Sequence, residues 1–138
     1  MRACDLPVTA LRDPHLFSGV VALESAGYFH GLNMYGITPV VLMSDTPTEI
    51  YTQYIRHVPF VFNTREGLTH LGGKLYVTTP ERTICELVMA DGNDEFILQS
   101  LESYLAKYGT EKAVMDYADK YGCSEQMRRR LDEIKECQ

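Results

Sequence analysis

A strand-like segment turns into a helix within residues 78–87, which read Thr-Thr-Pro-Glu-Arg-Thr-Ile-Cys-Glu-Leu. Just before it, Leu75 and Val77 occupy alternate positions, as they would in a half-buried strand. Thr79 followed by Pro80 is typical of a helix N-cap and the first helical position. The sequence therefore predicts that a strand ends and a helix begins at Thr79.

The predicted helix carries an acid next to a base in its first turn. Glu81 lies near the positive end of the helix dipole, which stabilises an exposed carboxylate by ~0.3–1 kcal/mol. Arg82 has two interpretations: it pairs with Glu86 one turn later, or it meets a partner molecule. We favour the structural pairing, because charge pairs four residues apart are routine on helices.

The size and charge of the chain limit its function. A length of 138 residues fits a single domain, and 45% hydrophobic with 23% charged residues is ordinary for a globular protein. The formal net charge of -6 works against non-specific binding to nucleic-acid phosphates. Arg128-Arg129-Arg130 is the only dense basic run, and neighbouring Asp and Glu residues favour a mixed-charge, solvated face.

Neither a membrane span nor a metal site is predicted. No window approaches the ~20 apolar residues that cross a bilayer, and the first residues do not resemble a secretory signal, so we expect a cytoplasmic protein. The four cysteines are dispersed without a C-x-x-C pair. We expect reduced thiols, no zinc site and no cofactor.

The N-terminal half predicts one helix followed by a strand. Apolar residues at helical spacing predict a helix over 17–29, with Ser18 as a candidate N-cap and Gly31 as a candidate stop. Val40–Met43 is too short for a helix and is bounded by prolines. We expect it to be a strand buried on both faces.

Further strands are predicted before the Thr-Pro helix. Residues 51–57 are ambiguous between a helix and a strand, whereas 58–62 are aromatic and β-branched and favour an extended segment. Gly72-Gly73 separates two short strand-like runs and is typical of a hairpin turn.

From Pro80 onward the pattern is helical. Three further helices follow the Thr-Pro helix, with Gly109 and Gly122 as stops and Thr110 and Ser124 as caps. The apolar stripe of the first of these includes Leu105 and Tyr108, and we assign such stripes to the core rather than to a partner surface. The predicted fold class is α+β: an N-terminal helix, a small mixed or antiparallel sheet with a Gly-Gly hairpin, and a C-terminal bundle of about four helices.

Two short motifs in this order resemble the C-terminal domain of AbiEi-type antitoxins of type IV toxin-antitoxin systems. The motifs are His30-Gly31-Leu32 and Thr79-Pro80-Glu81-Arg82-Thr83, with a short strand and a hairpin between them. The resemblance runs from about Phe17 to Ile134. It implies an N-terminal segment over 1–16 and one domain over 17–138, divided into helix plus sheet (17–79) and a helical tail (80–138).

The resemblance implies a non-catalytic, antitoxin-like protein. Such a protein binds or antagonises a cognate nucleotidyltransferase toxin, and the motif residues serve the fold: His30, Gly31, Leu32, Thr79, Pro80, Glu81, Arg82 and Glu86. Family members commonly carry an N-terminal winged helix-turn-helix, and about sixteen residues before the matching region are too few for one. DNA binding is therefore not expected. For partner binding we select exposed-type Tyr and Arg residues: Tyr51, Tyr54, Arg56, Arg128 and Arg129.

Three alternatives remain open from the residues alone. The first is a nucleic-acid-binding regulator that uses the helical tail, and the second is a remnant of a larger regulator. The third is an enzyme whose site is assembled from dispersed residues, namely His30, His57, His70, Glu81 and Arg82. The chain contains no nucleophile elbow, phosphate-binding loop or zinc-protease motif, so we expect no catalysis.

Overall fold

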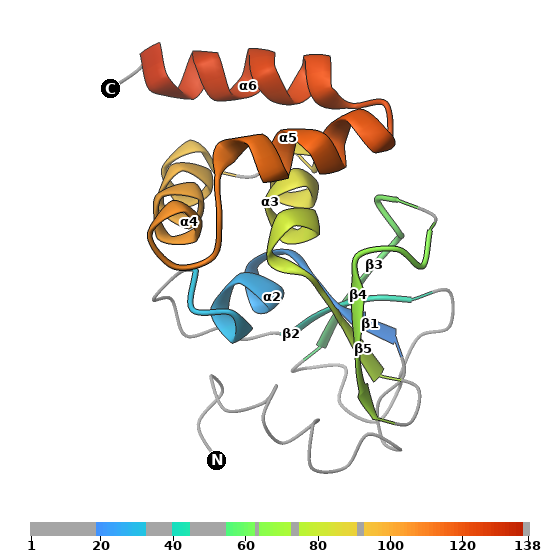
Figure 1. Ribbon diagram of the computed structural model, residues 1–138. Coiled ribbons are helices and arrows are strands. Elements are labelled where there is room, and N and C mark those ends of the chain that lie inside the picture. Colours follow the sequence, from blue (N-terminus) through green and yellow to red (C-terminus); the bar gives the residue numbers. More distant parts are fainter. Residues whose placement is uncertain are drawn as a thin grey trace.

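The computed structural model describes residues 19–32, 40–44, 55–62, 64–72, 75–90 and 93–136. These ranges form a sheet and a group of helices packed beside it (Figure 1). The elements in chain order are β1 (Gly19–Val21), α2 (Leu23–Phe29), β2 (Val40–Met43), β3 (Ile55–Val58), β4 (Leu68–Gly72), β5 (Leu75–Thr78), α3 (Pro80–Met89), α4 (Asp94–Lys107), α5 (Glu111–Lys120) and α6 (Ser124–Glu136). The α+β class is confirmed.

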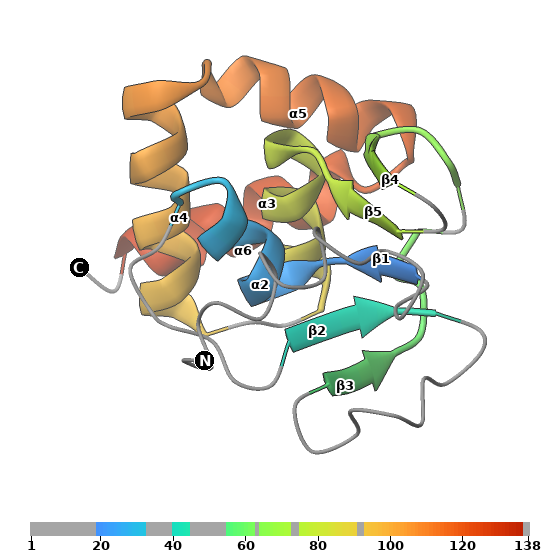
Figure 2. The same cartoon turned by 90° about the horizontal axis from the view of Figure 1, so that it is seen from below.

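The described strands form one mixed sheet in the order β3-β2-β1-β5-β4 (Figure 2). Strand β1 lies at the centre, antiparallel to β2 and parallel to β5. At one edge β3 runs parallel to β2, and at the other β4 and β5 form the predicted antiparallel hairpin. Helix α2 follows β1, and α3 follows β5, which pairs with β1. Both sequence motifs therefore lie next to these central strands.

Apolar side chains fill both faces of the central strands. Val20, Val41 and Met43 belong to the larger core with the helices, whereas Val21 and Leu42 belong to a smaller cluster. All four residues of β2 are buried, which confirms the strand predicted over Val40–Met43. The alternation follows from the period of two in a strand, which sends successive side chains to opposite faces.

The helix α3 lies between the sheet and helices α5 and α6 (Figure 1). It contacts α2, α4, α5 and α6. The predicted start of α3 is confirmed, since Pro80 is its first residue and Thr79 Oγ1 accepts a hydrogen bond from the Arg82 backbone amide at 3.4 Å. The hydroxyl satisfies one of the amides that lack a partner within the helix.

The caps of the helical tail follow the sequence signals with one exception. Thr110 caps α5 by accepting a hydrogen bond from the Ala113 amide, and Gly122 adopts a φ of 74° after that helix ends. Ser124 is the first residue of α6 rather than its cap, so this prediction was wrong by one position. No helix in the described part of the chain is long and apolar enough to cross a membrane.

The predicted helix over 17–29 is correct only in its second half. Residues Gly19–Val21 form strand β1, and the helix starts at Leu23 after Ala22, which makes no side-chain cap. The proposed cap Ser18 lies outside the described residues. Backbone pairing with β2 on one side and β5 on the other outweighs the helical spacing of the apolar residues here. Leu23 adopts a φ of 52° where the strand changes into the helix.

The strand predicted over 58–62 was also misplaced. Strand β3 covers Ile55–Val58, and the chain leaves the sheet at Pro59. Proline has no amide hydrogen to donate to a sheet ladder, and β2 offers only four residues to pair with. The ambiguity over 51–57 is resolved as a strand for the residues from Ile55 onward.

Candidate functional site

The two motifs of the sequence meet where α2 ends and α3 begins. His30 follows α2, and its Nε2 lies 2.6 Å from the carbonyl oxygen of Thr78, the last residue of β5. A carbonyl oxygen only accepts, so Nε2 carries the hydrogen. The hydroxyls of Thr78 and Thr83 lie 2.6 Å apart and are buried. Residues 48 positions apart are thus joined directly.

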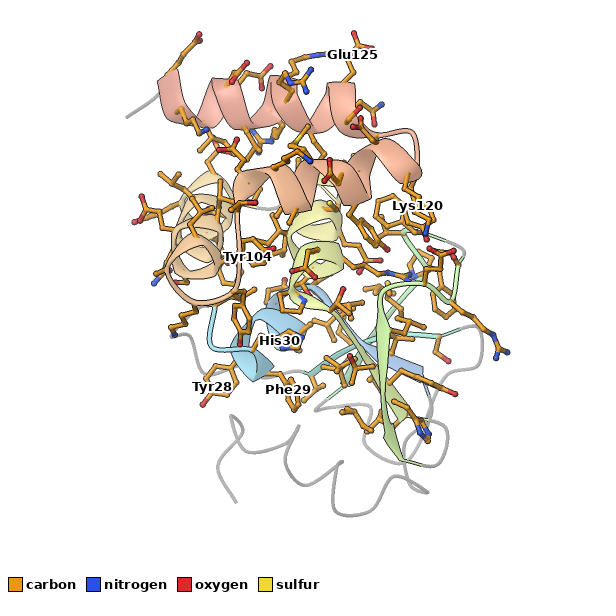
Figure 3. The ribbon with its side chains drawn as sticks, viewed as in Figure 1. Tyr28, Phe29, His30, Tyr104, Lys120 and Glu125 are labelled. Carbon is orange, nitrogen blue, oxygen red and sulfur yellow. The ribbon has the colours of Figure 1, made fainter. Side chains whose placement is uncertain are left out.

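Helix α4 joins this junction through its C-terminal half. The Tyr104 hydroxyl donates a hydrogen bond to Glu81 Oε2 at 2.7 Å. The Tyr108 hydroxyl donates to the His30 backbone carbonyl, and Lys107 Nζ donates to the Gly31 carbonyl at 2.9 Å. Figure 3 shows Tyr104 and His30 close together where α4 faces the end of α2. We call His30, Thr78, Glu81, Thr83 and Tyr104 the motif junction.

The electrostatics of the motif junction favour neutral, hydrogen-bonded groups around one carboxylate. Burial lowers the pKa of His30, and this effect exceeds the opposing effects of the Thr78 carbonyl and Glu81. Burial and the neighbouring Glu81 raise the pKa of Tyr104, so its hydroxyl stays protonated and donates. The junction therefore holds four elements together, namely α2, β5, α3 and α4.

The second cluster surrounds Arg82, whose side chain is fully buried. Its Nη1 donates to the carbonyl oxygens of Thr64 at 2.9 Å and Glu66 at 2.7 Å, and its Nη2 donates to the Phe62 carbonyl at 2.8 Å. Its Nε donates to Glu86 Oε2 at 3.1 Å, which confirms the predicted pairing one turn along the helix. Arg82 therefore fastens the connection between β3 and β4 to α3.

Glu86 is the buried counter-ion of this Arg82 cluster. Burial raises the pKa of Glu86 from the usual 4.5 to about 7, whereas Arg82 and the Phe62 backbone amide act in the opposite direction. Within the described part of the chain, Glu86 Oε1 has no hydrogen-bond partner. The Glu86 carboxylate therefore forms fewer of its possible hydrogen bonds than the Arg82 guanidinium does.

This arrangement predicts a pH dependence of stability. The pKa of Glu86 is higher in the folded chain than in the unfolded chain, so its contribution is fully present below about 4.5 and is lost as the pH rises through about 7. We expect the free energy of unfolding to fall by about 1 kcal/mol or more over this range, and to fall less in Glu86→Gln. Urea denaturation at both ends of the range measures the difference. Equal pH profiles for the two proteins would contradict the assignment.

The partner-binding residues predicted before α3 are only partly described. Tyr51 and Tyr54 lie outside the described residues. Arg56 is on β3 and exposed, and it forms an ion pair with Glu24 of α2 at 2.9 Å. Arg56 therefore has a partner within the chain and is not a free cation.

In the arginine run on α6, two side chains are exposed to solvent and one forms an ion pair. Arg128 and Arg129 are exposed. Arg130 pairs with Asp94 at the start of α4 and lies 4.0 Å from Glu133. For Arg130 the mixed-charge interpretation is thus confirmed, and two of the three arginines face solvent.

The residues of the enzyme alternative do not form one group. His30 and Glu81 belong to the motif junction, whereas Arg82 belongs to the separate Arg82 cluster. His70 is exposed on edge strand β4, where its ring contacts Tyr76 at a centroid distance of 4.9 Å. His57 belongs to β3, which is the edge strand at the opposite end of the sheet from β4. Among the described residues, no group of three or more His, Cys, Asp or Glu side chains could hold a metal ion.

The predicted core stripe of α4 is partly on the surface. Leu101 and Tyr104 are buried, but Leu105 is 44% and Tyr108 48% exposed. Residues four apart on a helix are rotated relative to each other about the helix axis. The apolar stripe is therefore wider than the face of α4 that α3 and α6 cover. Together with Phe29, they are the exposed large apolar side chains of the described ranges. The core positions predicted for Leu105 and Tyr108 were therefore wrong.

Cys85 and Cys123 are both free and buried. Burial raises the pKa of each thiol, so neither forms a reactive thiolate at neutral pH. Cys4 and Cys137 lie outside the described residues.

No known protein-family model matches the chain, and none of the curated proteins matches it. The relationship to AbiEi-type antitoxins remains a prediction from the motif residues.

Proposed function

We propose that the chain is a non-catalytic, antitoxin-like protein that binds or antagonises a cognate nucleotidyltransferase toxin. The proposal starts from the resemblance of the two motifs to AbiEi-type antitoxins. Its partner is a protein, and the contact with that partner uses the exposed surfaces of the helical tail.

One observation carries the proposal: the motif side chains are engaged with one another and with nearby backbone. His30 binds the Thr78 carbonyl, Glu81 accepts from Tyr104, and the fully buried Arg82 binds Glu86 and three carbonyl oxygens. Residues used in this way support the fold rather than chemistry on a substrate. A binding role on other surfaces is consistent with this arrangement.

The charge of the chain supports the same type of partner. The formal net charge is -6, and the segment from α4 to α6 alone carries ten acidic and seven basic side chains. An acidic surface accelerates encounter with a basic partner and disfavours nucleic acid. A nucleotide-binding toxin with a basic surface fits this requirement.

Co-expression tests the proposal. We expect a nucleotidyltransferase gene to lie next to this gene, and growth arrested by its product to recover when the full chain is co-expressed, with at least about a tenfold gain in colony count. Arg82→Ala should lose the recovery through instability, because it removes one partner of a buried ion pair.

The outcome against the proposal is equally concrete. If the chain is folded in the cell and every neighbouring nucleotidyltransferase stays toxic, the proposal fails. An electrophoretic shift that weakens steeply with salt, and disappears on charge reversal of Arg128 and Arg129, would support the nucleic-acid alternative instead.

A further inference from the structure

Helix α4 presents an alternating stripe of acids and leucines to solvent. Glu95, Leu98, Glu102 and Leu105 follow one another at intervals of three, four and three residues, so they lie along one side of the helix. Glu95 and Glu102 are exposed, Leu98 is half-buried and Leu105 is 44% exposed. The pattern combines apolar anchors with negative charge on a single face.

A groove runs beside this stripe. It has a volume of about 300 Å³, and its lining residues are Leu98, Leu101, Glu102, Leu105, Glu111 and Lys135. Three leucines of α4 form one wall, and the start of α5 and the end of α6 supply the rest. Leu101 is only 2% exposed and is the most buried of these three leucines. The groove therefore combines apolar leucines with charged side chains at its rim.

The charge at the rim is negative. Lys135 Nζ lies 3.3 Å from Glu111 Oε1, so these two charges compensate each other. Glu95 and Glu102 form no ion pair with any of the described residues. Within the described ranges, Glu102 therefore adds an unpaired carboxylate to the groove lining, and Glu95 adds a second one outside the lining, on the same side of α4 and seven residues or about 10.5 Å away along the helix.

We propose that this groove, called the α4 groove, docks a basic amphipathic helix of the partner protein. Apolar side chains of that helix would fill the space beside Leu101, and Lys or Arg side chains seven residues apart would meet Glu95 and Glu102. The proposal rests on the proposed function and specifies the chemistry of its partner. A second copy of this chain fits poorly, because pairing two α4 stripes places carboxylates opposite carboxylates.

Synthetic peptides provide the direct test. One probe is a helical peptide of about 18 residues with leucines at positions i, i+3, i+7 and i+10 and lysines seven apart beside them. Its control carries glutamates in place of the lysines. Titration into isotope-labelled full chain should shift the backbone resonances of α4, and the lysine peptide should bind at least about tenfold more tightly than its control. Equal affinity, or resonance shifts elsewhere, would overturn the proposal.

Variants of the chain confine the effect to the groove. Glu102→Lys should weaken the lysine peptide by about tenfold and improve binding of its control, and Leu105→Glu should weaken both. Glu125→Lys is the matched control, because Glu125 is exposed on α6 outside the groove lining and its reversal changes the net charge equally (Figure 3). Equal losses for Glu102→Lys and Glu125→Lys would indicate attraction to overall charge and overturn the docking site.

Toxin co-expression separates this proposal from the proposed function. If the wild-type chain restores growth and the Glu102→Lys and Leu105→Glu variants restore it equally well, the α4 groove is overturned and the proposed function stands. Specific peptide binding without any recovery would support the groove and reject the toxin partner. A wild-type dimer that Leu105→Glu converts to a monomer would overturn the choice of occupant.

Discussion

Replacing Arg82 by alanine should lower the free energy of unfolding by about 3–5 kcal/mol, because one partner of a buried ion pair is removed while the other stays. Glu86 is fully buried and would have to take up a proton. The carbonyl oxygens of Phe62, Thr64 and Glu66 would lose their donor at the same time. Denaturation in urea near neutral pH measures the loss.

Two further variants identify the cause. Arg56→Ala removes an exposed ion pair with Glu24 and should cost less than ~1 kcal/mol. Arg82→Ala combined with Glu86→Gln should be less destabilised than the sum of the two single changes, since no buried carboxylate is left unpaired. An unchanged melting temperature for Arg82→Ala would contradict the structural role of the arginine.

Replacing Tyr104 by alanine should destabilise the chain by about 3–5 kcal/mol, the range for removing a large buried aromatic side chain. Tyr104 is 1% exposed, its ring stacks on Tyr108, and its hydroxyl holds Glu81 at the start of α3. The change leaves a cavity between α3 and α4. Amide exchange in α4 should accelerate more than exchange in β2, whose backbone is paired with β1 and β3 in the sheet.

Tyr104→Phe separates the hydrogen bond from the packing. It keeps the ring and should cost about 1.5–3 kcal/mol, the value for a hydrogen bond to a charged group. A phenylalanine variant as unstable as the alanine variant would show that the hydroxyl alone joins the two helices. Equal stability of Tyr104→Phe and the wild-type chain would instead assign the whole effect to packing.

Short-range features were predictable because their cause lies within a few residues. Thr79 and Pro80 start α3, and Thr110 and Gly122 bound α5, since caps and positive φ angles depend on the residue itself and its next three or four neighbours. The Arg82–Glu86 pair belongs to the same class. The hairpin of β4 and β5 was predictable from its short connection.

Long-range features were not predictable from these patterns. Gly19–Val21 has the apolar spacing of the helix that follows it, and only its neighbours β2 and β5 make it a strand. Leu105 and Tyr108 share the helical spacing of Leu101, yet they are exposed whereas Leu101 is buried. The spacing of apolar residues identifies the apolar face of a helix or strand, but not whether another element packs against that face.

The sequence by itself therefore determined where α3 begins, how Arg82 pairs with Glu86, and that a sheet precedes a helical tail. The first two depend on residues at most a few positions apart, and the third follows from the change from strand-like to helical spacing along the chain. Only the tertiary structure placed His30 on the Thr78 carbonyl, turned Arg82 towards the carbonyls of 62–66, and left the leucines of α4 facing a groove. These depend on segments that are distant in the chain, and their positions follow from how the whole core packs.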